Sequence, residues 1–254
     1  MREKYVKAMK VRAENSLQKG NVDFAVQIAN IEIILDLEED MLASYYAIAY
    51  IEGKTFNEFT QMSSAIINKN LDYIYAAFKL TQYGQYAAAR TIFRNIYESL
   101  IILKTVALSD NQQLLADWMD GKDISMRKKI FGKIISPQSE EMKRLWNDLC
   151  KFCHGTVFSL QQSYDYNLIK TELQYNYVVL IMLLYMNYHV LNRYVFANNM
   201  KAMADRNICT SEDDMDTKEK RDLLRVKLKD SKHSLAKEPR KVLTDFSKVW
   251  KFVE

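Results

Sequence analysis

Glycine and proline are scarce in this chain of 254 residues, which contains six glycines and two prolines. Sheets with many turns use these two residues at their corners, so the composition argues against a strand-rich protein. The residues that favour helices, such as Leu, Ala, Lys, Met, Gln and Glu, are plentiful instead. We therefore predict an all-α fold, a bundle of long antiparallel helices with a helical C-terminal extension.

Cysteine is also rare, with an odd count of three: Cys150, Cys153 and Cys209. A chain of this length buries enough apolar surface to fold without disulfides. Its first twenty residues are charged throughout and lack the apolar core of a signal peptide. We therefore expect a cytoplasmic protein whose cysteines are free thiols.

Long apolar runs are missing too. The longest one, residues 177–186, has ten residues, which is too few to cross about 30 Å of hydrocarbon. Polar side chains, Asn187 and His189 among them, follow at once. The run predicts a buried central helix, and we expect no contact with a membrane.

Common catalytic signatures are absent as well: the chain contains no GxxxxGK[ST], GxGxxG, HExxH or GxSxG. The segment CKFCH, residues 150–154, has the spacing that attaches c-type haem, but haem attachment requires export. A thioredoxin-type thiol pair would need a βαβ context, and a zinc site would need a second close pair of ligands. We expect no cofactor and no metal, only two thiols at a helix end beside a capping His154.

The net charge of +4 is unevenly placed. Residues 217–254 contain twelve Lys or Arg and six Asp or Glu, a net of +6, which leaves −2 for the rest. We divide the chain into a helical bundle domain of residues 1–205, with its core at 20–205, an acidic linker at 206–217 and a basic helical tail at 218–254. Such a tail is suited to a polyanion or an acidic partner, although a solvated helix face would look the same.

Helix boundaries are predicted at residues that end or begin helices. Gly20, Gly84 and Gly121 are expected to end helices, and Pro137 is expected to begin one. The acidic residues 38–40 are expected where a helix ends or turns.

One helix, around residues 87–108, carries an ordered ladder of charges. Arg90, Arg94 and Glu98 lie four residues apart along the flank of an apolar stripe. Packing against other helices would leave this flank half buried, with Arg94 and Glu98 close enough to pair.

A second set of polar residues follows the apolar run. His189 and Arg193 are four residues apart in an otherwise apolar helix, so they need polar partners. We expect a polar seam that they share with Arg90, Arg94 or Glu98. Such a seam fits a bound phosphate or nucleotide, or internal ion pairs.

Two segments carry a family resemblance: AFKLTQYGQYAAARTIFRNIYESL at 77–100 and LWNDLCKFCHGT at 145–156. They resemble a group of uncharacterised bacterial all-helical proteins in which an Arg-x-x-x-Glu helix precedes a helix that ends in His-Gly or His-Ser. That group is similar to the HEPN superfamily of helical bundles, found in toxin, abortive-infection and RNA-cleaving systems. The resemblance covers roughly residues 71–200 and implies that Arg94, Glu98 and His154 occupy the polar positions.

The ribonuclease motif of HEPN enzymes, an Arg separated from a His by four to six residues, has no counterpart here. Asn147, Asp148 and Leu149 stand where that Arg would precede His154. A cation would have to come from elsewhere, for example from Arg94 or Arg144.

Three functions remain open. The first is an HEPN-like protein of a bacterial defence or stress system that binds nucleic acid or a nucleotide in a pocket lined by Arg90, Arg94, Glu98 and His154. The second is a non-catalytic module for homodimerisation or protein docking. The third is a divergent ribonuclease that uses His154.

Overall fold

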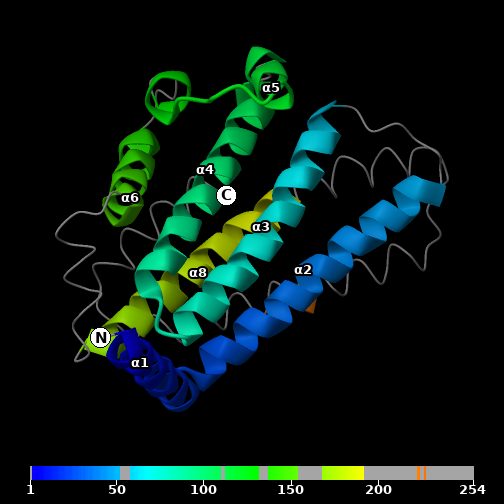
Figure 1. Ribbon diagram of the computed structural model, residues 1–254. Helices are drawn as coiled ribbons and strands as arrows, with labels where there is room; N and C mark the ends of the chain where they lie inside the picture. Colours follow the sequence, from blue (N-terminus) through cyan, green and yellow to red (C-terminus); the bar gives the residue numbers. More distant parts are fainter. Residues whose placement is uncertain are drawn as a thin grey trace.

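The computed structural model describes residues 2–51, 58–109, 112–131, 137–153, 168–191, 222–223 and 226. Every element in these ranges is helical, and no strand occurs among them, which confirms the all-α prediction. Figure 1 shows the helices packed on one another. In chain order they are α1 Arg2–Asp23, α2 Ala25–Ile51, α3 Glu58–Gln82, α4 Tyr86–Ser109, α5 Gln112–Met119, the π-helix η1 Met126–Phe131, α6 Pro137–Cys153 and α8 Ile169–Val190.

The central helix of the described structure is α8, which packs against α1, α2, α3 and α4. Its residues from Val178 to Leu184 are all buried. This placement confirms that the apolar run forms a buried central helix. None of the described helices is both long and apolar enough to cross a membrane.

Helices α3 and α4 form a hairpin whose turn depends on Gly84. Its φ of +71° lies in the left-handed region that disfavours side chains. An ideal Cβ at this position would also lie 2.7 Å from Ser16 Oγ on α1. The predicted helix break at Gly84 is confirmed, and glycine is required there by both backbone conformation and packing.

Two predicted boundaries are wrong. Helix α1 continues through Gly20 to Asp23, and Gly20 packs closely against Tyr177, whose hydroxyl would be 3.3 Å from an added Cβ. Helix α2 runs unbroken through residues 38–40, because buried Met41 and Leu42 continue the apolar stripe of the preceding turns. Glu38 is buried in the middle of that helix.

The shorter helices agree better with the prediction. Gly121, with φ of +68°, follows α5, and Pro137 begins α6 as expected. Helices α4 and α6 run antiparallel: Tyr97 donates a hydrogen bond to the Met142 carbonyl near the start of α6 (3.1 Å), while the earlier Arg94 of α4 interacts with Cys153 at the end of α6.

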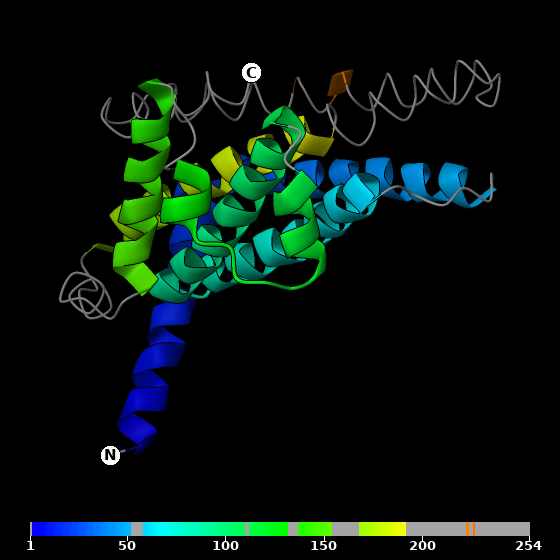
Figure 2. The same cartoon turned by 90° about the horizontal axis from the view of Figure 1, so that it is seen from above.

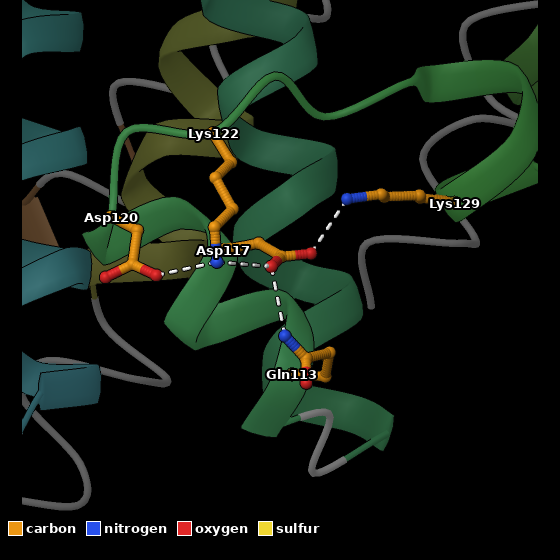
Figure 3. A network of polar contacts seen from close by, with 5 residues as sticks. All are labelled: Gln113, Asp117, Asp120, Lys122 and Lys129. Atoms are coloured by element: carbon orange, nitrogen blue, oxygen red, sulfur yellow. Dashed lines mark hydrogen bonds and ion pairs between the residues drawn. The ribbon is translucent and has the colours of Figure 1, made fainter.

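A polar network centred on Asp117 ties α5 to η1 (Figure 3). Its carboxylate accepts hydrogen bonds from Gln113 at 3.0 Å and from Lys129 of η1 at 2.7 Å. Lys122 lies 3.4 Å from the same carboxylate and 2.7 Å from Asp120. The bonds from Lys129 and Gln113 lower the pKa of Asp117 to about 2, so it stays charged at physiological pH.

The N-terminal half of α1 leaves the bundle, as Figure 2 shows. The α1 helix is anchored from Arg12 onward, where the Arg12 guanidinium lies 5.1 Å from the Tyr86 ring centroid. Ser16 then forms a 2.6 Å hydrogen bond with the Tyr86 hydroxyl. The predicted acidic linker at 206–217 lies outside the described residues, as does all of the basic tail at 218–254 except Asp222, Leu223 and Val226.

Candidate functional site

Arg90 lies inside the bundle, between α4 and α8. Its Nη2 donates to Glu172 Oε2 at 2.6 Å, and its Nε donates to Asn176 Oδ1 at 2.8 Å. The ring of Tyr175 covers the guanidinium at 4.5 Å. The expected half-buried position is therefore wrong for Arg90, because this part of the α4 flank faces the central helix.

The surroundings of Arg90 are an internal polar network. Asn176 Nδ2 donates to Thr81 Oγ1 at 3.1 Å, which carries the network to α3. Burial raises the pKa of Glu172 and lowers that of Arg90, while their pairing opposes both shifts. Arg90 is only 1% exposed, so this network links α3, α4 and α8 inside the bundle and offers no open surface to a ligand.

Arg94 and Glu98 lie further along the same flank and are half-buried. Arg94 Nε donates to Glu98 Oε1 at 2.8 Å, with side-chain exposures of 26% and 20%. The same carboxylate oxygen accepts a 2.6 Å hydrogen bond from Trp146 Nε1 of α6. The structure thus shows the direct pairing and the partial burial predicted for these two residues.

A second guanidinium approaches Trp146 from η1. Arg94 Cζ lies 5.8 Å and Arg127 Cζ 5.6 Å from the Trp146 ring centroid. Trp146 is largely buried, with the Phe131 ring 5.7 Å away, so it positions the two arginines and is not itself a surface platform. Arg127 is exposed and forms no ion pair with any residue that the structure describes. We call Arg94, Glu98, Arg127 and Trp146 the guanidinium cluster.

Charge at the guanidinium cluster is predominantly positive. Lys69 of α3 is near enough to Glu98 to interact with its charge; burial lowers the pKa of Lys69 and Glu98 opposes that effect. In the part of the chain that the structure describes, three cations, Lys69, Arg94 and Arg127, thus lie around Glu98 and its partner Trp146, and Glu98 is the carboxylate that interacts with Lys69 and Arg94. An anion that reaches this surface would meet uncompensated positive charge.

Two thiols of α6 border the guanidinium cluster. Burial opposes ionisation of Arg94, yet hydrogen bonds with Glu98 and Cys153 raise its pKa. Burial raises the pKa of the Cys150 thiol, which disfavours the reactive thiolate. No group of His, Cys, Asp and Glu side chains within the described ranges is arranged to hold a metal ion.

A second buried network, separate from Arg90, crosses the bundle through Asn187. Asn187 Nδ2 donates to Glu38 Oε2 at 2.8 Å, and Asn70 Nδ2 donates to Asn187 Oδ1 at 3.3 Å. Ser99 Oγ donates in turn to Asn70 Oδ1 at 2.9 Å. Sequence reasoning missed Glu38, although it lies seven residues after Ile31, in register with the buried apolar stripe of α2.

The remaining predicted site residues are only partly described. His189 lies on α8 with its ring centroid 4.5 Å from that of Tyr185. His154 and Arg193 lie outside the described residues, and His154 directly follows Cys153 in the sequence. No protein-family model, curated protein or solved structure matches this chain.

Proposed function

We propose that this is a cytoplasmic, HEPN-like helical protein of a bacterial defence or stress system, and that it binds nucleic acid or a nucleotide at the guanidinium cluster. The observation that carries the proposal is the convergence of Arg94 and Arg127 on Trp146, with the Glu98 carboxylate bonded to Arg94 and Trp146. Arg90, which the sequence assigned to the same pocket, belongs to the internal network and is left out of the proposed surface.

Guanidinium groups suit this role for two reasons. Their planar donors match phosphate oxygens, and their faces stack on unpaired bases. The indole of Trp146 and the carboxylate of Glu98 restrict Arg94, so less conformational entropy is lost when it binds an anion. Arg127, exposed and without an ion pair in the described structure, contributes a positive charge that a phosphate can use.

A titration of fluorescent single-stranded RNA and of ATP with the full chain tests the proposal. Arg127→Ala should weaken binding by about tenfold, and should reduce the slope of log affinity against log salt by about one. Lys19→Ala is the matched control, because Lys19 is an exposed cation that pairs only weakly with Asp23 at 4.0 Å. Failure of the wild type to bind either probe, or equal weakening by both variants, would contradict the proposed site.

A divergent ribonuclease is the second candidate, and one contact favours it. The thiol of Cys153, the residue before His154, interacts with Arg94, so a cation is close to that point of the chain. RNA degradation that is lost in His154→Ala and kept in Cys153→Ala would support ribonuclease activity. RNA that stays intact with pure wild-type protein would exclude it.

A further inference from the structure

The projecting part of α1 carries positive charge that the described structure does not balance. We call residues 4–11 the α1 arm. Lys4, Lys7 and Lys10 are exposed there, and none of them forms an ion pair with a described residue. Tyr5 and Val6 are exposed beside them. An unpacked helix with both basic and apolar side chains is suited to docking on an acidic, partly apolar surface.

Such a surface exists on α2 of the same chain. Four exposed acidic residues lie there: Glu32, Asp36, Glu39 and Asp40. The last three follow Glu32 by four, seven and eight residues, a spacing that places all four on one face of the helix. Glu32 lies 3.9 Å from Lys79, whereas Asp36 and Glu39 form no ion pair with any described residue. We call these four residues the acidic face.

The α1 arm and the acidic face of one chain do not meet. The two helices join at Phe24 and diverge from it, α1 leaving the bundle while α2 runs along it (Figures 1 and 2). Val22 and Val26, one on each side of this corner, are 75% and 60% exposed. Complementary charges that are held apart on one molecule, next to exposed apolar side chains, are arranged as in an interface between two copies.

The register of the charges fits a two-fold axis at this corner. Lys10 and Lys7 precede Phe24 by 14 and 17 residues, and Asp36 and Glu39 follow it by 12 and 15. At 1.5 Å per residue, all four lie about 18–26 Å from Phe24 along their helices. The lysines and the carboxylates also share a spacing of three residues.

We propose that two copies of this chain form a symmetric dimer in which each α1 arm lies antiparallel on the partner's α2. Lys10 then faces the partner's Asp36, and Lys7 faces the partner's Glu39. Val22 and Val26 of both copies pack near the axis. The dimer is independent of the proposed nucleic-acid binding, since no residue of the guanidinium cluster takes part in it.

Charge reversal in the full chain, followed by analytical ultracentrifugation over a range of concentrations, tests this dimer. The wild type should dimerise reversibly. One double variant carries Lys7→Glu and Lys10→Glu, and the other carries Asp36→Lys and Glu39→Lys. Each of them places like charges opposite one another across the proposed interface. Each double variant should therefore weaken dimerisation on the order of 100-fold. An equimolar mixture of the two double variants should dimerise again, because every contact in the mixed dimer regains opposite charges.

Lys128→Glu provides the control, because Lys128 is an exposed cation of η1 on neither helix, and it should dimerise like the wild type. The reversed residues are exposed, so each variant should keep the helical circular dichroism of the wild type. The proposal would be overturned by a wild type that is monomeric at every concentration, by a dimer that tolerates both reversals, or by reversed variants that do not recombine when mixed. A monomer whose α1 arm instead binds vesicles of anionic phospholipid would also overturn it.

Discussion

Replacing Glu38 by Gln should stabilise the protein, and the gain should grow with pH. Burial raises the pKa of Glu38 from 4.5 to about 8, and the hydrogen bond from Asn187 opposes that rise only in part. The second carboxyl oxygen, Oε1, has no hydrogen-bond partner among the described residues. The neutral acid is therefore the form that suits the core, and glutamine is its uncharged equivalent that still accepts the bond from Asn187.

The direction in which stability changes with pH follows from proton binding to Glu38. Between pH 4.5 and about 8 the folded chain keeps a proton on Glu38 that the unfolded chain releases. The free energy of unfolding of the wild type therefore falls as pH rises through this window, by at most 1.4 kcal/mol per pH unit. The accumulated loss is about 3 kcal/mol at pH 7, and it levels off near roughly 5 kcal/mol above the folded-state pKa.

Urea denaturation followed by circular dichroism measures the effect. Glu38→Gln should exceed the wild type in unfolding free energy by about 1 kcal/mol near pH 5 and about 3 kcal/mol at pH 7. Glu58→Gln is the matched control, because it makes the same chemical change at an exposed residue of α3; it should not reproduce the gain of Glu38→Gln. A Glu38→Gln difference that is constant across this range would refute the assignment of a buried, protonated Glu38.

Two further predictions concern other parts of the fold. Arg90→Met leaves Glu172 as a buried charge without its partner at 2.6 Å and should lower the unfolding free energy by about 3–5 kcal/mol. The double variant Arg90→Met with Glu172→Met should recover most of that loss in the same urea assay, and a double variant as unstable as the single one would contradict this account. Gly84→Ala should lower the melting temperature more than Gly121→Ala: both have positive φ, but only at Gly84 would the new Cβ meet Ser16 Oγ, at 2.7 Å. Equal shifts for the two glycines in a thermal scan would show that this contact is unimportant.

The Arg90 and Arg94 positions show how far the sequence predicts the candidate site. Both arginines lie on one flank of one helix, and the spacing of four residues correctly paired Arg94 with Glu98. The same reasoning failed for Arg90, whose partners lie 82 and 86 residues away along the chain. Periodicity shows that two residues share a flank, but it does not show which neighbouring helix covers each of them.

The sequence by itself determined the elements that depend on local interactions. Few glycines and prolines predicted the helices that make up the described part of the chain, Gly84 and Gly121 ended helices where a positive φ is needed, and Pro137 began one. These features arise within a few residues, through backbone sterics and hydrogen bonds between neighbouring turns.

Only the tertiary structure decided which polar side chains are buried in the bundle and which remain exposed to a ligand or partner. The bond from Asn187 to Glu38 spans 149 residues, and the bond from Trp146 to Glu98 spans 48. Both depend on how the helices pack, because a buried polar group takes its partner from whichever helix faces it. Packing thus enclosed Arg90 and Glu38 in the bundle, brought Arg94 and Arg127 to the same indole ring of Trp146, and left the α1 arm outside.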